Sequence, residues 1–173
     1  MKKPIDKRPA TGVKDFLALG VTTCGVGYIP GAPGTYGSAV GVAIYLLIEW
    51  MFLRLNLVGA RSIAIISVAF LAFCLLGIWS ASRSTELLGD LDPPQAVVDE
   101  VIGQLIVFLF VPFSVGWPFV LAGFLLFRLF DIWKPYPIDS LQNLDAGLGV
   151  CADDILAGVY AGVCLSIIYA VAI

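Results

Sequence analysis

Acidic residues and a Gly/Pro-rich segment border the hydrophobic stretches of this sequence at four places. They are residues 30–35 (PGAPGT), Asp99-Glu100, Asp131 with Lys134, and Asp153-Asp154. A carboxylate beside or inside an apolar span is energetically expensive, so such residues are the first candidates for function in a membrane protein. Several carboxylates that converge at one membrane depth would form a metal site of oxygen ligands next to an anionic substrate.

The composition indicates an integral membrane protein. Of the 173 residues, 60% are hydrophobic and 13% are charged, whereas a soluble domain is about half apolar and about a quarter charged. The chain has no histidine, which excludes histidine-dependent phosphatase mechanisms and His-ligated zinc or iron sites. The four cysteines form no CxxC pair and start no C-x5-R phosphatase loop, so we interpret them as small buried hydrophobic residues.

Hydropathy predicts five spanning helices, at residues 38–53, 62–80, 101–115, 117–133 and 154–173. Several of them are near the lower limit of the ~20 residues that a span needs. Residues 15–29 are weakly apolar and Gly-rich, which favours a re-entrant or membrane-level helix. We therefore predict an all-α integral membrane protein: a small bundle of about four to five transmembrane helices plus this short N-terminal helix. Its domains would be a basic tail at 1–14 and one membrane-embedded domain at 15–173.

Basic residues predict which way the bundle faces. Five of them precede the first apolar segment, namely Lys2, Lys3, Lys7, Arg8 and Lys14. The positive-inside rule then places the N-terminus in the cytoplasm, although Arg54 and Arg61 in the first outer loop count against it. Under this topology all four clusters lie at the cytoplasmic boundary. Residues 80–97 form the one sizeable polar stretch, and we expect a short amphipathic helix there on the membrane surface.

Each cluster also has a purely structural explanation. Asp99-Glu100 could serve the dipole of a first helical turn, and Asp153-Asp154 could cap the last span. One acid would suffice for either role, and Glu100 shares a helix face with the polar Gln104. We therefore interpret both pairs as candidate metal ligands.

The other two clusters could bind phosphate. Arg128, Asp131 and Lys134 line up near one face of a helix end. They could be an internal ion-pair ladder, but cations flanking a carboxylate also suit a phosphate bound next to a metal. The PGAPGT segment could be an ordinary turn, or it could offer backbone N–H groups and the hydroxyls of Thr35 and Ser38 to a phosphate.

Taken together, these stretches resemble the phosphatidylglycerophosphatase A family. The resemblance rests on IPGAPGTYGS (29–38), VVDEVIGQ (97–104), FRLFDIWKPYPI (127–138) and DDILAGVYAG (153–162), in the family's order and spacing. It implies a Mg²⁺-dependent, multi-pass enzyme of the bacterial inner membrane, with its active site facing the cytoplasm. The implied reaction is hydrolysis of phosphatidylglycerophosphate to phosphatidylglycerol and phosphate in phospholipid biosynthesis.

The expected site follows from the clusters and the resemblance together. The expected metal ligands are Asp99, Glu100, Asp131, Asp153 and Asp154. The expected catalytic residues are Asp99, Glu100, Asp131 and Asp154, and the expected phosphate-binding residues are Thr35, Ser38, Arg128 and Lys134. Two alternatives are a small ion-coupled transporter, which predicts acids near the midplane and inverted repeats, and a non-catalytic subunit of a lipid-synthesis complex. We expect a membrane lipid substrate and no nucleic acid, and the oligomeric state stays open.

Overall fold

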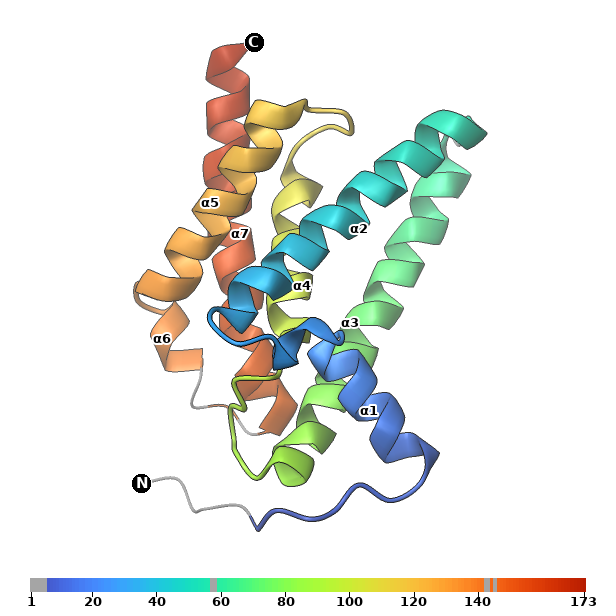
Figure 1. The fold of residues 1–173 in the computed structure, drawn as a ribbon. Coiled ribbons are helices and arrows are strands. Elements are labelled where there is room, and N and C mark those ends of the chain that lie inside the picture. The colour runs from blue at the N-terminus through green and yellow to red at the C-terminus, as the bar shows by residue number, and fades with distance from the viewer. Residues whose placement is uncertain (1–5, 57–58, 142–143, 145) are drawn as a thin grey trace.

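A computed structural model describes residues 6–56, 59–141, 144 and 146–173, which form a bundle of helices (Figure 1). The elements are α1 (Val13–Thr23), η1 (Val26–Tyr28), α2 (Pro33–Leu55), α3 (Ala60–Leu88), α4 (Val98–Val107), η2 (Phe108–Phe110), α5 (Trp117–Trp133), α6 (Ile138–Leu141) and α7 (Ala146–Ala172). The part of the chain that the structure describes contains no β-strand. The predicted all-α class is therefore confirmed.

Helix α4 lies at the centre of the bundle and packs against α2, α3, α5 and α7. Every residue of α4 except Glu100 is buried. Apolar side chains such as Val101, Ile102 and Leu105 account for this position, because they are removed from lipid and water on all sides. The acids in the first turn of α4 are consequently held where three other helices converge.

Small residues set how closely the neighbouring helices approach α4. A Cβ added to Gly158 of α7 would collide with the backbone oxygen of Gly103 on α4, and a Cβ on Gly41 of α2 would lie 2.8 Å from the Cβ of Gln104. Gly158 and Gly162 form the G-x-x-x-G spacing that permits such contact between membrane helices. The chain thus brings backbone against backbone where α7 crosses α4.

Helix boundaries differ from the sequence prediction at several places, including the span predicted at 101–115, where α4 covers Val98–Val107 and η2 ends at Phe110. Helix α2 begins at Pro33, five residues before the predicted span, because a proline at the first helical turn needs no N–H partner there. Helix α3 continues unbroken to Leu88, so the separate surface helix predicted within residues 80–97 is wrong. Helix α7 begins at Ala146, so Asp153 and Asp154 lie about two turns inside it and cannot be its cap.

Three helices among the described residues are long and apolar enough to cross a membrane: Pro33–Leu55, Ala60–Leu88 and Gly147–Ala172. Helix α4 with η2 covers only residues 98–110, and α5 has 17 residues, or about 25 Å against a hydrocarbon core of about 30 Å. The count of four to five spans therefore stays a prediction, as does the division of the chain at residue 14. Lys2 and Lys3 lie outside the described residues.

Candidate active site

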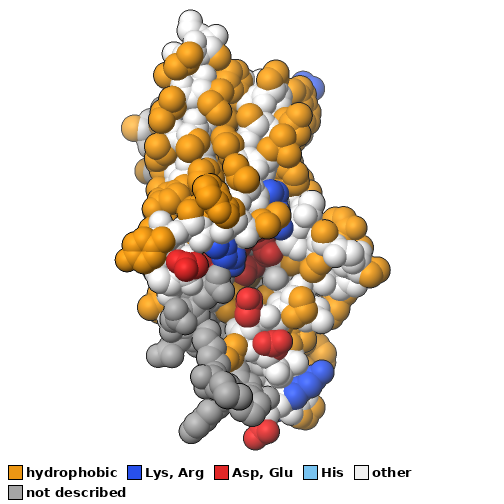
Figure 2. Space-filling model, turned by 90° about the vertical axis from the view of Figure 1, so that its left-hand side faces the viewer, with side chains coloured by type: hydrophobic (Ala, Val, Ile, Leu, Met, Phe, Trp, Pro, Cys, Tyr) orange, Lys and Arg blue, Asp and Glu red, His pale blue; other side chains and the backbone are white. Residues whose placement is uncertain are grey.

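A polar pocket of about 340 Å³ opens at one end of the bundle. It is lined by residues from the start of α2, the segment before α4, the first turn of α4, the end of α5 and the N-terminal part of α7. Its lining is Ala32, Pro33, Gly34, Asp92, Pro93, Pro94, Ala96, Asp99, Glu100, Arg128, Asp131, Lys134, Val150, Asp153 and Asp154. Figure 2 shows red and blue side chains gathered where the large apolar surface of the bundle ends. All four clusters from the sequence contribute to this pocket.

Three carboxylates in the pocket could hold a metal ion. One oxygen each from Asp99, Glu100 and Asp154 lies within 4.8 Å of the others. Asp99 and Asp154 are buried, and Glu100 is partly buried. Asp99 Oδ1 and Glu100 Oε2 are buried without a hydrogen-bond donor. Because an uncompensated buried charge is strongly destabilising, these orphaned oxygens fit a cation.

The remaining two carboxylates of the pocket already have cationic partners. Arg128 Nη1 donates to Asp131 Oδ2, and Lys134 Nζ donates to Asp153 Oδ2 at 2.6 Å. None of the ion pairs found among the described residues involves Asp99, Glu100 or Asp154. The acidic and basic side chains of the pocket therefore divide into three carboxylates that have no ion-pair partner among the described residues, and two cations, Arg128 and Lys134, that are each paired with their own acid.

Glycines in α2 allow it to contact the acid pair directly. A Cβ added to Gly34 would collide with Glu100 Oε1, and one added to Gly37 would lie 2.9 Å from Val97. The same added Cβ at Gly34 would be 3.2 Å from Arg128 Nη1. Glu100 and Arg128 are thus packed against the backbone of the first turn of α2.

Two of the predicted phosphate-binding residues lie outside the pocket lining. Thr35 is in the first turn of α2, where its N–H donates to the carbonyl of Ala32 at 3.0 Å. Ser38 is buried, its hydroxyl donates to the Gly34 carbonyl at 2.9 Å, and its Oγ lies 3.4 Å from Arg128 Nη1. Since helix α2 begins at Pro33, the predicted loop of free N–H groups is shorter than expected.

Sequence reasoning missed two residues near this site. Asp92 lines the pocket from the segment before α4, and it belongs to none of the four clusters identified in the sequence. Gln104 was placed on the face of Glu100 without a role. It is fully buried, and neither end of its amide has a hydrogen-bond partner. A polar residue one turn from an acid inside an apolar run was the available signal.

Fold and pocket together define a small helical membrane protein with an acidic site that could hold a metal at one end of its bundle. The family model for phosphatidylglycerophosphatase A matches residues 19–169. The chain belongs to the phosphatidylglycerophosphatase A family, and it is a phosphatase.

Curated relatives extend over most of the chain. Phosphatidylglycerophosphatase A of Haemophilus influenzae is 37% identical over 160 residues, covering 91% of this chain and 90% of the relative. The protein of the same name from Escherichia coli is 33% identical over 145 residues, covering 83% and 76%. A protein of Bacteroides thetaiotaomicron named "Putative phosphatidylinositol-3-phosphatase" is 35% identical over 163 residues, covering 93% and 96%. No solved structure matches.

Proposed function

We propose that this protein is a Mg²⁺-dependent phosphatidylglycerophosphatase, which hydrolyses the terminal phosphate of phosphatidylglycerophosphate to give phosphatidylglycerol and phosphate. The observation that carries the proposal is the division of the pocket. Asp99, Glu100 and Asp154 lack cationic partners, while Arg128 and Lys134 are held beside them. Such an arrangement suits a dianionic phosphate that lies between a metal and two fixed cations. Membership of the family supports the same reaction.

The donor set favours Mg²⁺ as the metal. The trio of Asp99, Glu100 and Asp154 offers oxygen ligands alone, and hard cations such as Mg²⁺ prefer oxygen. When bound, Mg²⁺ would neutralise charge on the phosphate and make a water molecule more acidic. Asp99, Glu100 and Asp154 would hold it. Asp131 and Asp153, which the sequence also suggested as metal ligands, would instead position the two cations.

The cations would bind and orient the phosphate. Arg128 uses Nη1 for Asp131 and Ser38, so its Nη2 remains as a donor for phosphate oxygens. Lys134 has two further N–H groups beyond the one that it gives to Asp153. Because Asp131 and Asp153 restrict both side chains, little conformational entropy remains to be lost when phosphate binds.

We assign proton transfer to Asp131. This carboxylate lines the same pocket as Asp99, Glu100 and Asp154 and accepts a hydrogen bond from Arg128. It would accept a proton from the attacking water as the new P–O bond forms. The P–O bond to the glycerol then breaks, and the proton passes to the glycerol oxygen that leaves. Water thus displaces the glycerol oxygen directly, and no covalent enzyme intermediate forms.

Aromatic side chains support a pocket at the membrane boundary. Trp133 and Tyr136 are 68% and 83% exposed at the pocket end of α5, and Trp117 is 70% exposed at its other end. Exposed Trp and Tyr are enriched at the two interfaces of a membrane. The 16 helical steps from Trp117 to Trp133 in the 17-residue α5 cover about 24 Å. We therefore propose that the lipid tails lie among the spans of a bacterial inner membrane while the headgroup enters the pocket from the cytoplasmic side.

A second candidate substrate has one specific observation in its favour. The relative from Bacteroides thetaiotaomicron is named a putative phosphatidylinositol-3-phosphatase, so a phosphorylated inositol lipid is a reasonable competitor for the same pocket. The transporter alternative predicts acids near the midplane, whereas the acids here line a pocket at one end of the bundle.

The proposed reaction is tested by measuring phosphate release from detergent-solubilised phosphatidylglycerophosphate and from phosphatidylinositol 3-phosphate, each with Mg²⁺ and with EDTA. We expect Mg²⁺-dependent release from phosphatidylglycerophosphate, and its loss in Asp131→Asn because the amide cannot accept the proton. Faster release from the inositol lipid would transfer the proposal to that substrate. Full activity of Asp131→Asn would show that the assignment of the proton acceptor is wrong.

Substitution of Lys134 tests the phosphate-binding half of the pocket. A charge-assisted hydrogen bond contributes about 1.5–3 kcal/mol, so Lys134→Met should lower kcat/KM by roughly 10–100-fold. We expect most of the loss in KM, because the trio is unchanged. Lys7→Met, at an exposed lysine of the N-terminal segment outside the pocket, is the matched control and should leave both constants unchanged. If the two variants behaved alike, Lys134 would have no part in binding phosphate.

A further inference from the structure

Helix α1 presents two contrasting faces. Val13, Phe16 and Leu17 are 75%, 64% and 56% exposed, and with Gly20 they occupy an arc of about 100° on the helix. The opposite face carries Asp15, Ala18 and Thr22, which are fully buried. Large apolar side chains that are exposed together on one stripe indicate an interaction surface.

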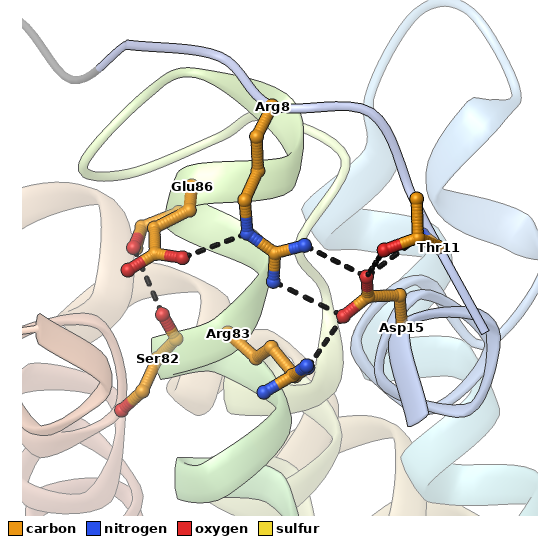
Figure 3. Close-up of polar contacts among 7 residues, drawn as sticks. Arg8, Thr11, Asp15, Ser82, Arg83 and Glu86 are labelled. Carbon is orange, nitrogen blue, oxygen red and sulfur yellow. Dashed lines mark hydrogen bonds and ion pairs between the residues drawn. The ribbon is translucent and has the colours of Figure 1, made fainter. Parts of the chain in front are cut away.

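An ion cluster around the buried Asp15 fixes the orientation of this helix (Figure 3). Asp15 accepts hydrogen bonds from Arg8 at 2.7 and 3.1 Å and from Arg83 on α3. The N–H of Thr11 donates to the same carboxylate at 2.8 Å, and Arg8 Nε donates to Glu86 at 2.9 Å. The Arg8 guanidinium holds the pKa of Asp15 well below its usual range, so the cluster is charged at neutral pH.

The other end of α1 is attached to the acid-bearing helix. The N–H of Val97 donates to the carbonyl of Thr22 at 2.8 Å, immediately before α4 begins. The hydroxyls of Thr22 and Ser84 are 3.4 Å apart. Held at both ends, α1 cannot rotate its apolar stripe inward without breaking these contacts.

We propose that α1 is an in-plane membrane anchor, whose stripe of Val13, Phe16 and Leu17 inserts at the boundary of headgroups and acyl chains in a bilayer that contains anionic lipid. The 11 residues of α1 cover about 17 Å, which is too short to cross a core of about 30 Å. An amphipathic helix instead lies in the interface, with its apolar face buried about 5–10 Å deep.

Continuity and charge favour lipid as the occupant. Helix α1 lies at the same end of the bundle as the first turns of α2 and α4 (Figure 1), beside the level where the apolar surface of the spans ends. Tyr28 and Ile29, 59% and 43% exposed, extend this surface toward the pocket. Lys14 is exposed on α1, and Arg8 and Arg83 are each about one third exposed. Both arginines are paired with Asp15 and Glu86, so the charge of Lys14 is the one that complements the phosphates of anionic lipids.

The anchor is tested by placing the photo-crosslinking residue p-benzoylphenylalanine at position 16, in the full chain in vesicles of phosphatidylglycerol and phosphatidylcholine. The same residue at Val68, 68% exposed on the candidate span α3, is the control expected to contact lipid. At Asp90, exposed beyond the end of α3, it is the control expected to contact water. Mass spectrometry after illumination counts lipid and chain–chain adducts.

We expect lipid adducts at position 16 as at position 68, few at position 90, and enrichment of phosphatidylglycerol among the adducts at position 16. A chain–chain adduct at position 16 would assign the stripe to a second copy. Absence of any adduct there would show that the stripe faces water. Adducts without enrichment of the anionic lipid would overturn the proposed role of Lys14. Because no readout uses catalysis, these results stand apart from the proposed phosphatase reaction.

Discussion

Asp154→Asn will remove divalent-cation binding and lower phosphate release by about 10²–10³-fold, the range for losing one preorganised electrostatic contact to a transition state. Asp154 supplies one of the three carboxylate oxygens that lie within 4.8 Å of one another. An amide of nearly the same shape leaves the packing of α7 intact but is a weak ligand for a hard cation. The defect should therefore be in the site and not in the fold.

The same substitution should raise stability when no metal is present. The three carboxylates repel one another, and no described ion pair offsets them, so neutralising one relieves repulsion in a buried place. We expect Asp154→Asn to have a higher Tm than the wild type in EDTA. Mg²⁺ should raise the Tm of the wild type but change the Tm of Asp154→Asn little. A metal ligand is thus distinguished from a structural acid, because its replacement raises the Tm in EDTA and removes the increase in Tm that Mg²⁺ causes.

Asp139→Asn provides the control for Asp154→Asn. Asp139 is exposed on α6 and is not part of the pocket lining, so its loss should change neither the Mg²⁺-dependent gain in Tm nor phosphate release. A wild-type response to Mg²⁺ in Asp154→Asn would mean that the trio is not the metal site.

The sequence located the acids of the site better than it located the helices. Charges that interrupt apolar runs are visible directly, and Asp99, Asp131 and Asp154 all line the pocket. Helix ends were less predictable, because the Ala-Gly-Leu-Gly run that starts α7 is too weakly apolar to register as a span. Packing of Gly147 against Ser82 and the Ile78 carbonyl of α3 stabilises that turn, and such a contact has no signature within a local window.

Whether an ion pair could be predicted from the sequence depended on how far apart its two residues are along the chain. Arg128 and Asp131 are three residues apart on one helix, so their ion pair was foreseeable. Lys134 and Asp153 are 19 residues apart on different elements, and Arg83 and Asp15 are 68 apart. Only the tertiary structure shows that Asp153 pairs with Lys134, whereas the next residue, Asp154, lies beside Asp99 and Glu100.

Gly158→Val will destabilise the bundle and move Asp154 on α7 away from Asp99 and Glu100 on α4. A Cβ at this position would collide with the backbone oxygen of Gly103 and lie 3.1 Å from its Cα. Backbone cannot yield as a flexible side chain does, so α7 must move away from α4. Overpacking of this kind costs about 1–3 kcal/mol, which we expect as a lower Tm in detergent.

Activity should fall together with stability in Gly158→Val, because Asp99 and Glu100 are on α4 and Asp154 is on α7. Any shift that relieves the collision lengthens the distances within the trio, so Mg²⁺ should no longer raise the Tm. The matched control is Gly20→Val on α1, where an added Cβ meets nothing within 4 Å and valine is at least as favourable in a helix as glycine. If Gly158→Val retained the Tm and Mg²⁺ response of Gly20→Val, close contact between α4 and α7 would not be what assembles the site.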